Sequence, residues 1–194
     1  MVMQRDAEAT RQRLIAAGRA EFAAYGITGA RVDRIADAAQ SNKAQIYHYF
    51  TNKAGLFDAV WSDLVEQIVD GLPLEVEDLP GVAVMLCDIY AEHPELPRLI
   101  TWQRLERGDA AGNEIAAKDS RRRVELIDRA LADGVISSRF PADVVFALML
   151  HIAAFWEFTS PDVMRVMNAA DRDQRREVVR AVVAAVLTKP AAVG

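Results

Sequence analysis

The residues best suited to chemistry in this chain lie together in one short stretch, residues 43–50. Ile46 and Phe50 are four positions apart, so on a helix they share one face and can point into a core. A lysine on the opposite face can donate to guanine or phosphate, a glutamine can pair with adenine, and a tyrosine can donate to phosphate. The stretch therefore predicts a DNA-reading helix, whose groove-facing residues would be Lys43, Ala44, Gln45, Tyr47, His48 and Tyr49.

A second interpretation of the same stretch remains open. Tyr47, Tyr49 and Phe50 could be ordinary core aromatics, and Lys43 could be a solvated surface charge.

The elements that would position this helix precede it directly. An apolar pattern with helical spacing covers residues 32–39, and the polar residues 40–42 follow as a turn in which Ser41 or Asn42 can cap the next helix. A longer helix over residues 7–25, stopped by Gly26, can brace the pair. The spacing therefore predicts a helix-turn-helix, whose second short helix lies in the major groove of DNA.

The remainder of the chain also shows the apolar spacing of helices, and no long alternation of apolar and polar residues predicts a sheet. The expected fold class is all-α, with about nine helices over residues 7–25, 32–39, 43–50, 53–70, 78–92, 94–107, 114–132, 141–158 and 171–187.

Charge is unevenly distributed along the 194 residues, whose net charge is −5. Residues 1–53 carry eight basic and five acidic residues, a balance of +3, while the remainder carries −8. Such asymmetry indicates a nucleic-acid-binding part joined to an acidic body.

Three features of the sequence bear on where the protein acts. The single cysteine, Cys87, precludes an intrachain disulfide. The start of the chain has no apolar signal segment, and the apolar run over 144–156 is too short to span a membrane. A cytoplasmic protein without a membrane partner is expected.

Signals for catalysis are absent from the sequence. His48, His93 and His151 are isolated, with no metal-ligand spacing, and no glycine-rich phosphate loop or nucleophile motif is found. The sequence predicts no enzyme, no cofactor and no metal site. The alternative is a helical protein that uses the fold for an enzymatic or protein-interaction role without binding DNA.

Several ordered segments resemble the tetracycline-repressor (TetR) family. They are residues 22–26 (FAAYG), 31–39 (RVDRIADAA), 46–50 (IYHYF), 52–53 and 56–57, and the resemblance extends over about residues 10–61. It implies an all-helical homodimer with a DNA-binding domain, here residues 1–53, and a ligand-binding and dimerisation domain, here residues 54–194. It also implies a repressor that a small molecule releases from a palindromic operator.

The resemblance also assigns roles to single residues. The recognition-helix contacts of the family correspond to Lys43, Gln45, Tyr47 and His48, and its phosphate contacts correspond to Tyr49 and Lys53. The predicted DNA-binding set also includes Arg31, Asn42 and Ala44. Arg31 stands where the family often has a capping Ser or Thr; it can contact phosphate but cannot cap. Gln40 and Ser41 replace the usual glycine and apolar residue of the turn, and we expect a slightly altered turn because this position can need a positive φ.

The carboxyl-terminal part gives weaker signals. The last two predicted helices carry apolar residues over 144–156 and at Val178, Val182 and nearby positions, so together with a second copy they can form a four-helix dimer interface; a monomeric core is the alternative. We interpret His151 as a hydrogen-bonded core histidine, Cys87 as a small buried hydrophobe and residues 121–123 (RRR) as a solvated face. An apolar or aromatic effector is expected in a pocket lined by Trp61, Met85, Tyr90, Trp102, Leu105, Met149, Phe155 and Trp156, although each is also compatible with ordinary core.

Overall fold

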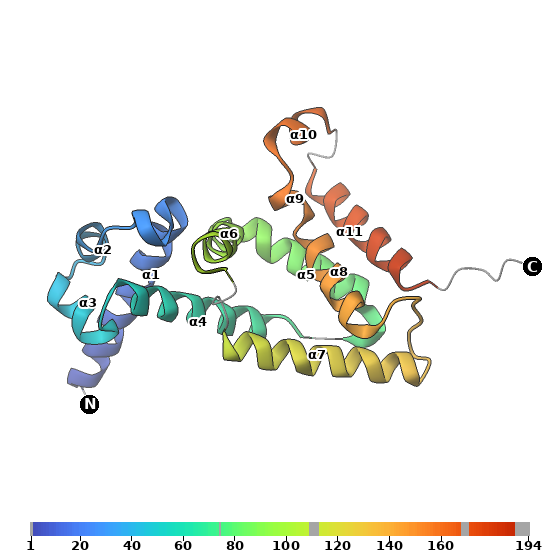
Figure 1. Ribbon diagram of the computed structural model, residues 1–194, viewed down its shortest axis with the longest axis horizontal. Helices are drawn as coiled ribbons and strands as arrows, with labels where there is room; N and C mark the ends of the chain where they lie inside the picture. Colours follow the sequence, from blue (N-terminus) through green and yellow to red (C-terminus); the bar gives the residue numbers. More distant parts are fainter. Residues whose placement is uncertain (1, 74, 109–112, 168–170, 189–194) are drawn as a thin grey trace, which may run out of the picture. The chain divides into compact units, whose positions relative to one another are not determined.

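The computed structural model describes residues 2–73, 75–108, 113–167 and 171–188, and these form eleven α-helices and one 3₁₀ helix without a strand (Figure 1). The all-α prediction is confirmed. The predicted number of about nine helices is too low, because the predicted helix over residues 141–158 is divided in two and a short helix was not predicted at all.

The first four helices are α1 (Val2–Gly29), α2 (Val32–Ala38), α3 (Lys43–Phe50) and α4 (Lys53–Gly71). The helical dihedrals of α1 are interrupted at Gly26, where φ is 72° and ψ is 179°. This is backbone that only glycine adopts readily, and a Cβ atom there would also collide with Glu106 and with the Trp102 ring. The predicted helix stop at Gly26 is therefore confirmed.

The later elements are the 3₁₀ helix η1 (Val76–Asp78), α5 (Leu79–Glu92), α6 (Glu95–Arg107), α7 (Glu114–Ala132), α8 (Ala142–Ala153), α9 (Phe155–Phe158), α10 (Pro161–Val166) and α11 (Arg172–Val186). Short polar side chains begin several of them: Asp78 accepts from the Gly81 N–H at 2.9 Å, and Asp171 accepts from the Asp173 N–H at 2.8 Å. Ala154, with φ −88° and ψ 0°, separates α8 from α9. Most of the predicted loop over residues 108–112 lies outside the described residues.

The chain divides into two compact units. The first comprises Met1–Ile68 and Glu95–Ile115, and the second comprises Val69–Pro94 and Ala116–Gly194. Helix α6 thus belongs with the amino-terminal helices, and Figure 1 shows it beside α1. The centre of the first unit includes Phe22 and Phe57, both fully buried, whose rings meet edge to face with centroids 5.2 Å apart.

The second unit has its core where α5 packs against α8 and α11. Leu86 of α5, Met149 of α8 and Val179 and Val183 of α11 are each at most 2% exposed. Within the described parts of the chain, none of the helices combines the length and the apolar character that crossing a bilayer requires.

Two of the side-chain interpretations in this unit are wrong. Arg123 is buried: its Nη2 donates to the Leu72 carbonyl at 2.8 Å, and its guanidinium pairs with Asp119, so the run over 121–123 is not a uniformly solvated face. His151 is exposed on α8, where its Nδ1 lies 2.7 Å from the Ala147 carbonyl oxygen, so it is hydrogen-bonded but not in the core. The interpretation of Cys87 as a buried residue is confirmed.

Candidate nucleic-acid interface

The turn between α2 and α3 depends on one residue in left-handed backbone. Gln40 has a φ of 50°, as the missing glycine of the sequence pattern suggested. Its N–H donates to the Asp37 carbonyl at 3.1 Å, and the Ser41 N–H donates to the Ala36 carbonyl at 2.9 Å. These two bonds form a Schellman motif, which satisfies the last carbonyls of α2 and turns the chain toward α3.

The start of α3 is fixed by a side-chain cap. Asn42 is extended, with φ −135° and ψ 163°, and its Oδ1 accepts from the Gln45 N–H at 3.0 Å. Of the two caps considered, Ser41 and Asn42, the structure thus uses Asn42. The carboxamide oxygen is engaged in this cap, so Asn42 would present its NH₂ group to a nucleic acid.

Helix α3 has a buried face and an open face, as its spacing predicts. Ile46 is fully buried and Phe50 is 6% exposed, whereas Tyr47 is 49% exposed. The interpretation of Tyr47 as a core aromatic is therefore wrong, and that of Phe50 is right. Of the other predicted DNA-binding residues on this helix, Gln45 and Tyr49 are half-buried, and Lys43, Ala44 and His48 are exposed.

An acidic residue that the sequence argument missed lies beside the first residue of α3. The Lys43 ammonium forms an ion pair with the carboxylate of Asp33 on α2, and both side chains are about half exposed. In water such a pair contributes little to stability. Its effect on a nucleic-acid interface is larger, because Asp33 places a negative charge against a residue predicted to meet phosphate or base.

The beginning of α2 is held by a carboxylate from α1. Arg31 precedes α2 in extended backbone and makes no side-chain cap, in agreement with the expectation that arginine cannot cap. The buried Glu21 accepts instead, from the Arg31 N–H at 2.8 Å and from Arg34 Nε at 2.8 Å. Burial by itself raises the pKa of Glu21, but the hydrogen bonds from Arg34 and Arg31 and the charges of both arginines outweigh it, so the pKa lies below its usual value. The Arg31 side chain is exposed, which suits the predicted phosphate contact.

Lys53, at the start of α4, is largely occupied within the protein. Its Nζ donates to the Thr28 and Ala30 carbonyl oxygens, both at 2.9 Å. An ammonium has three N–H donors, so one remains for a phosphate oxygen. The structure therefore gives Lys53 a role that the sequence did not reveal, since it ties the end of α1 and the approach to α2 onto α4.

A second tie to the helix-turn-helix comes from α6. The Glu106 carboxylate accepts from the Ile27 N–H at 3.1 Å and from both the N–H and the hydroxyl of Thr28 at 2.7 Å. It satisfies backbone donors left open by the break at Gly26. The neighbouring Arg107 pairs with Asp58 of α4 and lies over the Phe57 ring, with its guanidinium carbon 4.8 Å from the centroid.

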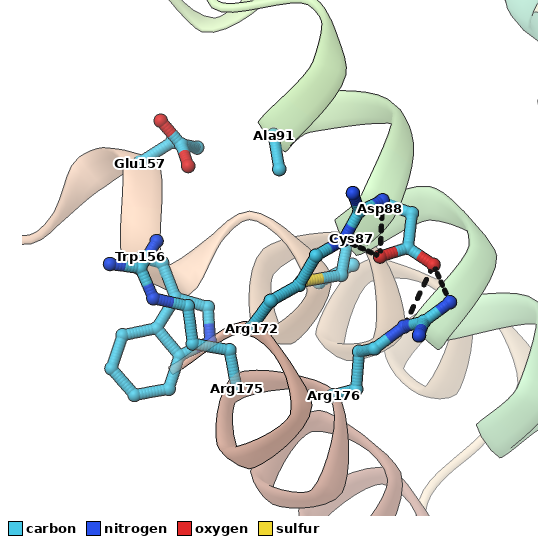
Figure 2. Close-up of a pocket in the computed structure, with 9 residues that line it drawn as sticks. Cys87, Asp88, Ala91, Trp156, Glu157, Arg172, Arg175 and Arg176 are labelled. Atoms are coloured by element: carbon cyan, nitrogen blue, oxygen red, sulfur yellow. Dashed lines mark hydrogen bonds and ion pairs between the residues drawn. The ribbon is translucent and has the colours of Figure 1, made fainter. Parts of the chain in front are cut away.

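The predicted ligand-binding residues are not gathered in one compact unit. Trp61, Trp102 and Leu105 belong to the first unit, whereas Met85, Tyr90, Met149, Phe155 and Trp156 belong to the second. Leu105 is 71% exposed, while Tyr90 and Met149 are core residues of the second unit. Trp156 borders a cavity of about 280 Å³ within the second unit (Figure 2).

Comparison with known proteins places these elements in a family. The domain described as "Bacterial regulatory proteins, tetR family" matches residues 14–60, and "Tetracyclin repressor-like, C-terminal domain" matches residues 78–186, more than half of the chain. The chain is 37% identical over 165 residues to the HTH-type transcriptional repressor SCO4008 of Streptomyces coelicolor, covering 84% of this chain and 85% of that protein.

Solved structures show the same fold. The transcriptional regulator SCO4942 of Streptomyces coelicolor has a TM-score of 0.82 and 34% identity, with 93% of this chain and 99% of that chain covered. The Bacillus subtilis regulator FadR in complex with stearoyl-CoA has a TM-score of 0.73 at 14% identity, over 91% of this chain and 97% of that chain, which shows the shared fold. The matching family models describe regulatory proteins. The chain belongs to the TetR family of bacterial regulatory proteins and is a DNA-binding transcriptional regulator with an amino-terminal helix-turn-helix.

Proposed function

We propose that the protein is a repressor that binds a palindromic operator as a homodimer and leaves it when a small molecule binds. The observation that carries the proposal is the open face of α3, where Lys43, Tyr47 and His48 are exposed above the buried Ile46 and Phe50. A helix so divided can enter the major groove while its back remains in the core. On this proposal Lys43 and Gln45 read base edges, and Arg31, Tyr49 and Lys53 contact phosphate.

The proposed division of roles follows the chain. Residues 1–53 bind DNA, and residues 54–194 bind the effector and dimerise. Helices α8 and α11, which correspond to the last two predicted helices, supply the dimer interface, and the exposed Val144, Val178 and Val182 support this because large apolar side chains on two neighbouring helices favour a partner. Two α3 helices then meet successive major grooves, about 34–36 Å apart or somewhat more.

The effector is proposed to be a small molecule with an apolar or aromatic body, and release follows if it favours a dimer geometry other than the one that binds DNA. The protein is proposed to act in the cytoplasm as a regulator without catalytic activity, cofactor or membrane partner.

Selection of bound fragments from genomic DNA, followed by gel shift at several salt concentrations, tests the DNA-binding role. The double variant Lys43→Ala with Gln45→Ala should lose at least about tenfold in affinity for the selected site, since each good base contact contributes about 1–3 kcal/mol. Lys118→Ala, which removes an exposed lysine from α7, is the matched control and should bind as the unaltered protein does. Absence of any salt-sensitive, sequence-specific complex would refute the proposed role.

The dimer has a separate test. Val178→Asp places a charge on the exposed apolar face of α11 and should shift sedimentation toward the monomer at micromolar concentration. Arg165→Ala, on the exposed side of α10, is the control. A monomeric unaltered protein would exclude the proposed interface.

A further inference from the structure

An ion pair lies at the amino-terminal end of the open face of α3. The ammonium of Lys43, the first residue of α3, is paired with the carboxylate of Asp33 in the first turn of α2, and both side chains are about half exposed. Helices α2 and α3 pack against each other (Figure 1), so the helix-turn-helix itself brings the two charges together. Because the first residues of a recognition helix are those that meet base edges, the pair lies where a base pair would be read.

The carboxylate of Asp33 makes Lys43 a poor ligand for phosphate. A phosphate oxygen bonded to the ammonium and the Asp33 oxygen would each lie about 2.8 Å from the same nitrogen, so the two anions would be less than about 6 Å apart and would repel each other. The pair also has no net charge, so it adds little to the counterion release that drives non-specific binding. The edge of a base is uncharged and meets neither obstacle.

The pair presents hydrogen-bond donors and an acceptor side by side. An ammonium has three N–H groups, and one of them is engaged by Asp33, so two remain for a base. The contact is made by Oδ1 of Asp33, and a carboxylate has about four acceptor positions, so it can also accept from a base amino group. The structure gives neither side chain another partner among the residues that it describes.

The major-groove edge of a G·C pair matches this arrangement. Guanine offers two neighbouring acceptors, N7 and O6, and the paired cytosine offers its N4 amino donor beside O6. In an A·T pair the acceptors are separated, because the N6 donor follows adenine N7 and a methyl group flanks thymine O4. Two free N–H groups with an adjacent acceptor therefore fit G·C better than A·T.

We propose that Lys43 and Asp33 together read a G·C base pair in each half of the operator. The ammonium donates to N7 and O6 of guanine, and the carboxylate accepts from N4 of the paired cytosine. The inference rests on the proposed function and deepens it, because it names a base pair that the operator must contain and adds Asp33 to the residues that determine specificity.

The first test uses the unaltered full-length protein and the duplex that it selects from random-sequence DNA. Each guanine of a half-site is replaced in turn by 7-deazaguanine, which lacks the N7 acceptor, or by inosine, which lacks only the minor-groove amino group. At one guanine we expect 7-deazaguanine to lower affinity about fivefold or more and inosine to have no effect, since a hydrogen bond from a charged donor is lost only in the first case. A half-site without any guanine sensitive to 7-deazaguanine would overturn the proposal.

Variants assign this contact to the pair. Lys43→Met keeps the length of the side chain without its donors and should remove the sensitivity to 7-deazaguanine at that position. Asp33→Asn should lower the preference for G·C over A·T there by about threefold or more, because an amide presents both a donor and an acceptor, as adenine requires. Asp37→Asn removes an exposed carboxylate from the same helix and is the matched control. An unchanged preference in Asp33→Asn, or an equal loss in Asp37→Asn, would contradict the proposal.

A double-mutant cycle shows whether the two side chains act together. In the Lys43→Met background, Asp33→Asn should change the preference for G·C little further, whereas additive effects would indicate independent contacts and overturn the proposal. The charge of Asp33 also favours the start of α2, so Asp33→Asn can lower stability. A loss of folded protein lowers binding to the G·C and A·T duplexes equally, and the ratio of the two affinities is therefore the decisive measurement.

The outcomes separate this inference from the proposed function. If Lys43→Met weakens binding to all duplexes equally and reduces the log–log salt slope by about 0.9, Lys43 is a phosphate contact; this would overturn the inference and leave the repressor intact. An unaltered protein that forms no sequence-specific complex would refute the proposed function, and the inference with it.

Discussion

Replacing Gln40 with glycine should stabilise the protein. Gln40 is exposed and has a φ of 50°, where an L-residue is disfavoured by roughly 1–2 kcal/mol because its Cβ crowds the backbone. Glycine removes that strain but makes the unfolded chain more flexible, which offsets about 0.5–1 kcal/mol of the gain. The net expectation is about 0.5–1 kcal/mol, which corresponds to a rise in Tm of about 1–4 °C for a chain of this size.

Two neighbouring variants serve as controls for Gln40→Gly. Gln40→Ala keeps a Cβ in the same backbone and should change stability little. Ala38→Gly introduces glycine into helical backbone of α2 and should destabilise by roughly 0.5–1 kcal/mol. Urea and thermal unfolding followed by circular dichroism provide the measurement. A Gln40→Gly protein no more stable than Gln40→Ala would show that the turn is not strained at this residue.

Three further perturbations test the charges and burial. Asp33→Asn should release Lys43 toward phosphate, raising affinity for non-specific DNA and steepening its log–log salt dependence by about 0.9; anisotropy titrations with an unchanged slope would contradict this. Tyr90→Phe should abolish a loss of stability at alkaline pH. Burial raises the pKa of Tyr90 from 10.0 to about 12, so between these pH values the folded protein keeps a proton that the unfolded chain loses. The free energy of unfolding of the unaltered protein should therefore fall by ~2.7 kcal/mol between pH 10 and pH 12. Equal alkaline slopes in both proteins would refute the assignment. Glu21→Gln should lower the free energy of unfolding by roughly 1–3 kcal/mol near pH 7. Because the pKa of Glu21 in the folded protein lies below its ordinary value of 4.5, the carboxylate stabilises the protein at pH values above 4.5. The difference in stability between the two proteins should therefore shrink below pH 4.5 and vanish as the pH falls through the folded pKa.

The sequence predicts the helices best where polar residues mark their ends. The predicted bounds of α3 and α7 agree with the structure to the residue, because a cap or a turn signal stands at each boundary. The break at Ala154 has no such signal. The segment around it is apolar nearly throughout, so its periodicity cannot tell one continuous helix from two, and packing within the second unit decides.

In the candidate DNA interface, too, features set by local spacing are predictable from the sequence, whereas contacts between helices are not. The buried and open faces of α3 follow from spacing alone, since Ile46 and Phe50 are one helical turn apart. The pairing of Lys43 with Asp33 depends on how α2 and α3 cross, which no local pattern encodes. Arg123 shows the limit within a single helix: Asp119, four residues earlier, is a local hint of pairing, but only the fold shows that Arg123 is the buried member of its basic run.

The position of α6 bears on how a ligand signal could reach DNA. Although α6 lies in the middle of the sequence, it belongs to the unit that contains the helix-turn-helix, so the chain passes between the two units three times, after residues 68, 94 and 115. The second passage leads into α6, whose Glu106 holds the backbone N–H groups of Ile27 and Thr28, a few residues before α2. The first passage lies within α4, whose Lys53 holds the Thr28 and Ala30 carbonyls. Helices α6 and α4 thus hold the same short segment, from residue 27 to residue 30, which lies just before α2. The residues proposed to bind DNA can therefore end at residue 53 although the compact unit that contains them extends further, because the segment that positions α2 and α3 is held by Lys53 and by Glu106.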